Sequence, residues 1–249
     1  MINVLLVGSN GAMGKTMQEL VEDTPDISII AGINAVPVDN APFPTYQTFG
    51  AVNEHPDVLV DFSHRSLLMD ILSYSISEKV PAVLATTGYT DDDEALVRQA
   101  AEKTAIFRSM NMSYGVFIMN ELLKKAAVLL EAGYDAEIIE AHHNKKQDSP
   151  SGTAKMLLNT LKAEASKTDL KPVYGRSPQS GRRKPNEIGM HSLRGGTIVG
   201  EHSVVFAGCD EIIKIEHTAL SKKIFASGAI KAARFLKGKS TGLYSMSNI

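Results

Sequence analysis

The amino-acid sequence predicts an α/β protein: a doubly wound parallel sheet plus a smaller α+β domain with a mixed sheet. Two observations predict this class. Short apolar runs alternate with helical stretches through residues 1–108, which is the pattern of strands and helices in a doubly wound sheet. The first apolar run is followed at once by Gly8, Gly11 and Gly14, the strand–turn–helix start of a βαβ unit.

The first βαβ unit takes up about 30 residues. Residues 2–7 form a nearly continuous apolar run, as expected for a strand that is buried on both faces of a parallel sheet. A helix is predicted over residues 12–22, and the Asp-Thr-Pro sequence at residues 23–25 ends it. The second strand is predicted at residues 27–33.

The same alternation continues to residue 108, and it predicts a Rossmann-like doubly wound parallel sheet. Acidic residues gather at the start of one predicted helix, where the helix dipole favours them. The further predicted elements are strands at residues 58–62, 82–85 and 105–108 and helices at residues 66–79 and 91–103.

The pattern changes near residue 113, where a second domain is expected to begin. Several strands follow one another here, which predicts an antiparallel or mixed sheet. The predicted elements are helices at residues 116–132, 154–166 and 224–236, strands at residues 136–140, 188–193, 197–207 and 211–218, and an exposed loop at residues 171–187.

Charge argues against a nucleic-acid-binding protein. The 249 residues include 26 Lys and Arg and 28 Asp and Glu, a net charge of -2, whereas nucleic-acid binders are commonly basic. Residues 1–139 hold 8 basic and 19 acidic side chains, and residues 140–249 hold 18 and 9. We interpret the basic second part as containing, among other things, the site of a small anionic substrate.

The single cysteine, Cys209, excludes a disulfide framework within the chain and is consistent with a reducing compartment. We expect Cys209 to be a small buried residue. No apolar run approaches the roughly 18–20 residues that span a bilayer, and the N-terminal run lacks the features of a signal peptide. The sequence therefore predicts a cytoplasmic protein that contacts no membrane.

The glycine turn predicts a dinucleotide site, with a purely structural turn as the alternative. Glycine allows the backbone to approach a pyrophosphate at a helix N-terminus. Asn34 stands 20 residues after Gly14, where an acid commonly binds the ribose. An amide can bind a 2′-hydroxyl and does not repel a 2′-phosphate. The pattern therefore predicts NADH or NADPH, with NADH favoured by the acidic surroundings.

Residues 140–154 contain the densest group of chemically active side chains in the sequence. His142 and Lys146 suit proton transfer at the end of a strand. The Ser-Gly-Thr sequence at residues 151–153 opens a helix, where backbone N–H groups can bind a carboxylate. Adjacent histidines on a strand point apart, and no cysteine or carboxylate stands at ligand spacing, so no metal site is predicted.

This segment resembles the signature of the 4-hydroxy-tetrahydrodipicolinate reductase family, also called dihydrodipicolinate reductase. The resemblance covers essentially the whole chain. Supporting matches are the glycine turn and the sequences at residues 86–88, 111–115, 195–202 and 225–228. It implies reduction of a cyclic imine dicarboxylate to tetrahydrodipicolinate with NADH or NADPH, as part of lysine and diaminopimelate biosynthesis.

The resemblance also implies residue roles. His142 matches the family's proton donor and acceptor, and Lys146 matches its partner proton donor. The matching substrate-binding residues are His143, Ser151, Gly152 and Thr153. The matching cofactor-binding residues are Gly8, Ser9, Asn10, Gly11, Ala12, Met13, Asn34, Ala85, Thr86, Thr87, Ser109, Met110, Asn111 and Met112. Asn34, Ala35 and Ala85 depart from the residues that are common at these positions.

The domains expected from the resemblance are a dinucleotide-binding domain over residues 1–113, completed by the C-terminal segment 223–249, and a substrate-binding and tetramerisation domain over residues 114–222. The implied partners are a small anionic dicarboxylate substrate and three further copies of the chain in a homotetramer. Two other functions stay open: a nucleotide-sensing regulator on the same fold, and a dehydrogenase acting on aspartate or diaminopimelate.

Overall fold

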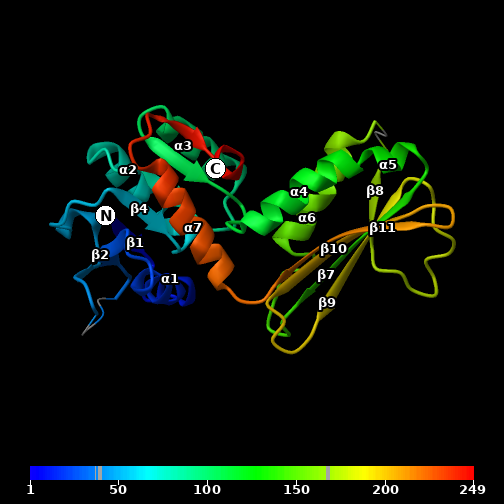
Figure 1. Cartoon of the computed structure of the whole chain (residues 1–249), viewed down its shortest axis with the longest axis horizontal. Coiled ribbons are helices and arrows are strands. Elements are labelled where there is room, and N and C mark those ends of the chain that lie inside the picture. Colours follow the sequence, from blue (N-terminus) through cyan, green and yellow to red (C-terminus); the bar gives the residue numbers. More distant parts are fainter. Residues whose placement is uncertain (37, 39–40, 167–168) are drawn as a thin grey trace. The chain divides into compact units, whose positions relative to one another are not determined.

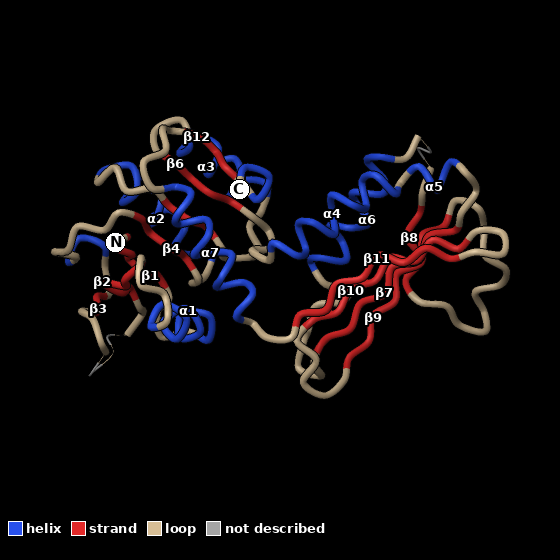
Figure 2. The backbone as a smooth tube through the Cα atoms, viewed as in Figure 1, coloured by secondary structure: helices blue, strands red, loops and turns tan. Residues whose placement is uncertain are grey.

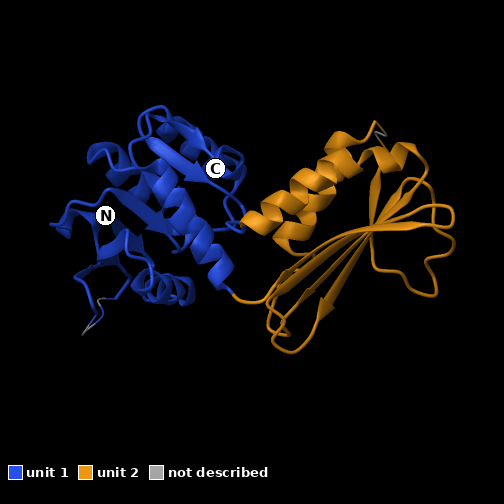
Figure 3. Cartoon of the chain, viewed as in Figure 1, with its two compact units in different colours: residues 1–113, 222–249 blue, residues 114–221 orange. Residues whose placement is uncertain are grey.

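The computed structural model of the chain describes residues 1–36, 38, 41–166 and 169–249. The chain divides into two compact units (Figure 3). Unit 1 comprises residues 1–113 and 222–249, and unit 2 comprises residues 114–221. Each unit has its own sheet and its own helices (Figure 1).

Unit 1 contains a parallel seven-stranded sheet in the order β12-β6-β5-β4-β1-β2-β3. The strands are β1 (Ile2–Val7), β2 (Ile27–Ile33), β3 (Thr45–Tyr46), β4 (Val58–Asp61), β5 (Ala82–Leu84), β6 (Ala105–Arg108) and β12 (Gly242–Tyr244). The central strands β4 and β5 are buried along their whole length, which explains their continuous apolar sequence. The predicted Rossmann-like sheet is confirmed.

Helices pack on this sheet and complete its core. They are α1 (Ala12–Glu22), α2 (Leu68–Ser77), α3 (Asp91–Ala101) and α7 (Lys223–Leu236), with 3-10 helices at η1 (Phe49–Ala51), η2 (Arg65–Leu67) and η3 (Met246–Asn248). The C-terminal helix α7 lies beside α1 and against the central strands. The last part of the chain therefore belongs to the same compact unit as its beginning.

Unit 2 contains a mixed five-stranded sheet in the order β11-β10-β7-β9-β8. Its central strand β7 runs antiparallel to β10 and parallel to β9, so the predicted mixed sheet is confirmed. The strands are β7 (Asp135–His142), β8 (Lys171–Tyr174), β9 (Glu187–Arg194), β10 (Gly200–Ala207) and β11 (Ile212–Ala219), and the helices are α4 (Tyr114–Ala126), α5 (Val128–Glu131) and α6 (Gly152–Glu164).

The core of unit 2 lies between the sheet and the helices α4 and α6, which run side by side (Figure 2). Ile138 and Phe206 from the sheet belong to one buried cluster with Leu123 of α4 and Leu157 of α6. Alternate strand residues point to opposite faces, so only one face of this sheet takes part in that core.

Three local predictions were wrong. The loop predicted at residues 171–187 begins with the strand β8, which is too short and too polar to be recognised. The helix predicted at residues 116–132 is divided at Ala127 into α4 and α5. Cys209 is exposed, not buried, because it lies in the turn between β10 and β11.

The charge asymmetry of the sequence does not follow the two units. Unit 1 carries 12 basic and 15 acidic side chains, and unit 2 carries 14 and 13. The two units are nearly balanced because the basic segment 222–249, from the basic second part of the sequence, belongs to unit 1. Within unit 2, Arg176 and Arg183 both form ion pairs with Glu137. The charge balance therefore carries no information about the substrate.

In the part of the chain that the structure describes, no helix is both long enough and apolar enough to cross a bilayer.

Gly228 in α7 provides a test of the packing in unit 1. A Cβ at this position would lie 1.7 Å from the carbonyl oxygen of Met112, and a backbone atom cannot rotate away. Helix propensity favours alanine over glycine by about 1 kcal/mol, whereas overpacking costs about 1–3 kcal/mol or more. We expect Gly228→Ala to lower the free energy of unfolding, measured by urea denaturation. The control Gly50→Ala, with open space around the new methyl group, should change it little.

Candidate active site

The glycine turn of unit 1 joins the end of β1 to the start of α1. Gly8 has a φ of +79°, which a residue with a side chain rarely adopts, and a Cβ on Gly14 would lie 2.3 Å from the carbonyl oxygen of Gly8. Gly11 caps α1 without a side-chain hydrogen bond, and no acid lies in the first turn. The amides of that turn are thus left for an anion, and the turn fits a dinucleotide pyrophosphate.

Asn34 follows β2 and turns its side chain into the glycine turn. Its Nδ2 donates a hydrogen bond to Ser9 Oγ, and its Oδ1 accepts one from the backbone N–H of Asn10, each at 2.8 Å. Only 7% of the residue is exposed. Both polar ends of the side chain therefore hold the turn in place. Along the turn Ser9 is buried, Met13 is half-buried, and Asn10, Gly11 and Ala12 are exposed.

Arg108 joins the two segments that were predicted to lie beside the nicotinamide. From the end of β6 its guanidinium donates to the carbonyl oxygens of Thr86 at 2.9 Å and Ser109 at 3.1 Å. This is the carboxyl edge of the sheet, where doubly wound folds bind ligands. Of the other candidates, Met112 is buried, Ala85 and Asn111 are half-buried, and Thr87 and Met110 are exposed.

In unit 2, His142 ends β7 and shares a face of the sheet with Glu140. The Nδ1 of His142 lies 2.5 Å from Oε2 of Glu140. Arg194, the register partner of His142 on β9, donates its two terminal nitrogens to the Glu140 carboxylate at 2.9 and 2.8 Å. Glu140 is 1% exposed. A buried carboxylate therefore lies between a guanidinium and the candidate catalytic histidine.

The electrostatics of this group follow from burial and hydrogen bonding. Burial opposes ionisation of Glu140, but hydrogen bonds from Arg194, Ser192 and His142 outweigh it and hold the pKa of Glu140 at about 2. Burial lowers the pKa of His142, and Glu140 offsets only part of this effect. A neutral imidazole thus faces an ionised carboxylate at neutral pH.

The start of α6 meets the same group. Ser151 caps the helix, because its Oγ accepts a hydrogen bond from the N–H of Ala154 at 3.1 Å, and its own N–H donates to Glu140 at 3.2 Å. Gly152, the first helical residue, is exposed, and Thr153 is half-buried. The helix end therefore offers its amide groups to an anion beside the histidine.

Lys146 and His143 complete the predicted set. The Nζ of Lys146 lies 2.7 Å from a carboxylate oxygen of Asp148, and its positive charge contributes to the lowered pKa of His142. His143 follows β7 and is half-buried. The structure thus brings the predicted catalytic and substrate-binding residues of unit 2 together at one end of its sheet.

Sequence reasoning missed three members of this group: Glu140, Arg194 and His202. His202 on β10 is 6% exposed, its ring lies 5.2 Å from that of His142, and its Nε2 lies 3.0 Å from Ser151 Oγ. Burial, with the neighbouring charge of His142, lowers the pKa of His202 to about 4. The position of Glu140 two residues before His142 was the available signal, since that spacing puts both on one face of a strand.

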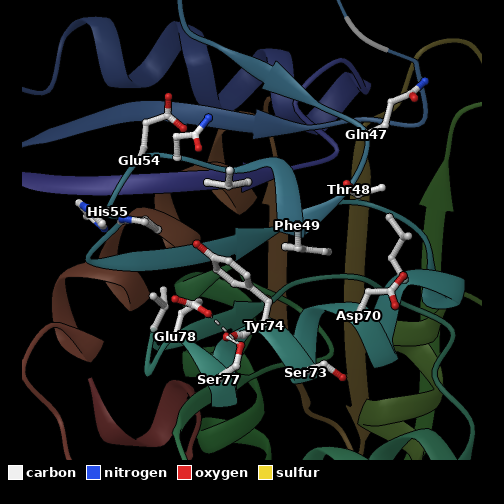
Figure 4. A pocket seen from close by; sticks show the side chains of 16 residues that line it. Gln47, Thr48, Phe49, Glu54, His55, Asp70, Ser73, Tyr74, Ser77 and Glu78 are labelled. Carbon is white, nitrogen blue, oxygen red and sulfur yellow. Dashed lines mark hydrogen bonds between the residues drawn. The ribbon is translucent and has the colours of Figure 1, made fainter.

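A separate pocket of about 710 Å³ lies in unit 1 beside α2 (Figure 4). Its lining includes Phe49, Tyr74, Glu54, Asp70 and Glu78, and none of the predicted site residues. The carboxylates give it the wrong charge for a dicarboxylate. Among the described residues, no group of His, Cys, Asp and Glu is arranged to hold a metal ion.

Comparison with known proteins gives a consistent result over the whole chain. Residues 2–112 match the family model described as dihydrodipicolinate reductase, N-terminus, and residues 115–249 match its C-terminal counterpart. The 4-hydroxy-tetrahydrodipicolinate reductase of Clostridium tetani is 45% identical over 246 residues, which is 99% of this chain and 96% of the relative. That of Exiguobacterium sibiricum is 47% identical over 245 residues, 98% and 95% of the two chains.

Among solved structures, the dipicolinate-bound dihydrodipicolinate reductase from Paenisporosarcina sp. TG-14 is similar to this chain with a TM-score of 0.81. The alignment covers 100% of this chain and 99% of that chain, at 22% sequence identity. This likeness extends the agreement to the fold of both units.

The lowered pKa of His202 predicts a pH dependence of stability. The unfolded chain binds a proton at this histidine near pH 6.5, whereas the folded chain does so only near pH 4. Stability is therefore lost as the pH falls below 6.5. When the pH falls from 6.5 to about 5, His202 should cost the wild type roughly 2 kcal/mol of its free energy of unfolding. His202→Gln should not lose this amount, as measured by urea unfolding at both pH values. The exposed control His55→Gln should leave the loss unchanged, and an unchanged loss in His202→Gln would contradict the assignment.

Proposed function

Because the chain belongs to the dihydrodipicolinate reductase family, we propose that the cluster around His142 in unit 2 is its active site. The chain is an oxidoreductase that converts 4-hydroxy-tetrahydrodipicolinate to tetrahydrodipicolinate with NADH or NADPH, in lysine and diaminopimelate biosynthesis. The observation that carries the site proposal is the buried Glu140–His142 pair beside the start of α6.

The substrate is a dicarboxylate, and the site has the groups that bind carboxylates. The backbone N–H groups of Gly152 and Thr153 lie at the start of α6, where the helix dipole favours an anion. Lys146 provides an ammonium group, and His143 a second imidazole. We assign one carboxylate to the helix end, with Lys146 and His143 as the remaining partners.

His142 is the proton donor to the ring. When bound, the dinucleotide supplies a hydride, and hydride addition to the ring leaves an electron-rich carbon that must take up a proton. His142 has its Nδ1 on Glu140, so its Nε2 is the nitrogen that exchanges protons with the substrate. Lys146 is the second proton donor of the site.

The dinucleotide is held by unit 1. The amides at the start of α1 bind the pyrophosphate, Asn34 keeps the turn in shape, and the segments joined by Arg108 bind the nicotinamide end. Asn34 brings no charge to the ribose position, so both dinucleotides are accepted, with NADH preferred. Residues 1–113 with 223–249 form the dinucleotide-binding domain, and residues 114–222 form the substrate-binding and tetramerisation domain.

The chain forms a cytoplasmic homotetramer through unit 2. The face of its sheet opposite the α4 and α6 core carries Ile139, Leu193 and Ile212, which are all exposed in the single chain. An exposed apolar surface of this kind is typical of a protein–protein interface. A cytoplasmic location is supported by the single cysteine, which is consistent with a reducing compartment. Light scattering tests the assembly state.

An absorbance assay of dinucleotide oxidation with enzymatically prepared substrate tests the function. We expect substrate-dependent oxidation of both NADH and NADPH. Absence of oxidation would support a nucleotide sensor, and reduction of NAD by aspartate or diaminopimelate would support an amino-acid dehydrogenase.

The proton donor is tested by His142→Gln. We expect kcat to fall by at least about 100-fold with little change in KM, because glutamine fills similar space but cannot donate a proton to carbon. His191→Gln, which changes a histidine paired with Glu137 on the opposite face of the sheet, serves as the control. Turnover at the wild-type rate in His142→Gln would exclude this role.

The uncharged ribose position is tested by Asn34→Asp. An added carboxylate should weaken NADPH binding by about tenfold relative to NADH binding, measured by the fluorescence of the bound dinucleotide. Asn34→Ala, which removes the hydrogen bonds to the turn without adding charge, should weaken both dinucleotides alike. Equal weakening of NADH and NADPH binding by Asn34→Asp would show that this side chain does not influence the choice of dinucleotide.

A further inference from the structure

We propose that Glu140, locked in place by Arg194, is a positioning residue that keeps the proton of His142 on Nδ1, so that His142 enters the reaction as a base at Nε2. The inference rests on the proposed function, in which His142 exchanges protons with the substrate. It adds a role for two residues and the direction of the first proton transfer.

Glu140 fixes the orientation of the His142 imidazole. Glu140 and His142 stand two residues apart on β7, and their side chains therefore leave the same face of the sheet. The carboxylate oxygen Oε2 lies 2.5 Å from Nδ1. Because an ionised carboxylate can only accept a hydrogen bond, the proton between these atoms belongs to Nδ1. In a neutral imidazole, Nε2 then carries a lone pair.

Hydrogen bonds from Arg194 and Ser151 keep the carboxylate of Glu140 ionised and in place. Arg194 donates hydrogen bonds to both oxygens of Glu140, at 2.9 and 2.8 Å. This bidentate geometry fixes the orientation of the carboxylate and also stabilises its negative charge. The same guanidinium donates to the carbonyl oxygens of Leu193 and Asp148. The N–H of Ser151 supplies a further hydrogen bond to Glu140. Residues of β9 and of the start of α6 therefore both hold this carboxylate in place.

Gly200 lies beside Nε2 of His142. A Cβ on Gly200 would lie 3.2 Å from Nε2 of His142, so the glycine leaves this side of the ring uncrowded. The charged or titratable groups around His142 are Glu140 on its own strand, Arg194 on β9, His202 on β10 and Lys146 in the following loop. Only Glu140 favours the imidazolium, and it does so at Nδ1.

A base at Nε2 suits the net reaction, which removes a hydroxyl as well as adding hydride. Nε2 takes a proton from the ring carbon between the imine carbon and the carbon that bears the hydroxyl. The electron pair of that C–H bond forms a double bond, and the C–O bond breaks as Lys146 gives its proton to the leaving hydroxyl. After hydride addition, the proton on Nε2 returns to the same ring carbon. One water leaves, and the solvent reprotonates Lys146.

The tautomer is tested directly on the wild-type enzyme by two-bond ¹⁵N–¹H NMR of ¹⁵N-histidine-labelled protein, with His142→Gln used to assign the signal. We expect protonated Nδ1 and bare Nε2 at neutral pH. A proton on Nε2 would overturn the inference. If His142→Gln shows the wild-type kcat, the proposed catalytic role of His142 fails. The tautomer of His142 in the wild type is a separate result, which tests only the effect of Glu140 on the imidazole.

The base role is tested without a dinucleotide. Wild-type enzyme, substrate and D₂O should give deuterium at the ring carbon named above faster than His142→Gln or enzyme-free buffer does. Exchange at the rate of the enzyme-free buffer would overturn the base role. If a Glu140 variant fails to fold, the tautomer measurement on the wild-type enzyme still tests the role of Glu140.

Glu140→Gln should lower kcat by at least about 100-fold, leave KM nearly unchanged, and move the acid limb of the kcat/KM profile to lower pH, because the neutral amide no longer favours the imidazolium. The matched control is Glu137→Gln, on the same strand and also hydrogen-bonded to a histidine and arginines, but on the opposite face. Glu137→Gln should leave kcat and the acid limb of the kcat/KM profile unchanged. Wild-type kcat and acid limb in Glu140→Gln would contradict the proposal.

Discussion

The buried carboxylate of Glu140 is the constraint on which the candidate active site depends. Removing one partner of a buried ion pair costs about 3–5 kcal/mol, so Glu140 and Arg194 require each other. Glu140 also bonds the N–H of Ser151 and the ring of His142. A single ionised side chain thereby sets the position of the strand end, the helix start and the imidazole relative to one another.

Unit 1 uses hydrogen bonds to its glycine turn and strand ends for the same purpose. Both ends of the Asn34 amide form hydrogen bonds with the glycine turn. Arg108 donates to backbone carbonyl oxygens at two neighbouring strand ends. These side chains shape backbone that is itself free to bind a ligand. The difference between the units follows from their tasks, because binding a dinucleotide needs fixed amides, whereas moving a proton needs a fixed titratable group.

The charged groups around His142 let the site bind an anion without protonating the histidine. The positive charge of Lys146 suits a substrate with two carboxylates, and Lys146, Arg194 and burial all lower the pKa of the histidine. Glu140 neutralises Arg194 and supports the imidazolium only when it forms. The site can therefore attract an anion while its histidine stays uncharged.

The sequence by itself determined the α/β class, the βαβ start, the mixed second sheet and the segment at residues 140–154, because these depend on local periodicity and on residues close together in the chain. Tertiary structure alone brought Arg194 and His202 to His142. Arg194 lies 52 positions and His202 lies 60 positions further along the chain, and they reach His142 only because β9 and β10 pair with β7 on either side. It also decided that Asn34 faces the turn, and that the basic C-terminal segment belongs to unit 1. Strand pairing and side-chain direction are non-local, so no pattern along the chain specifies them.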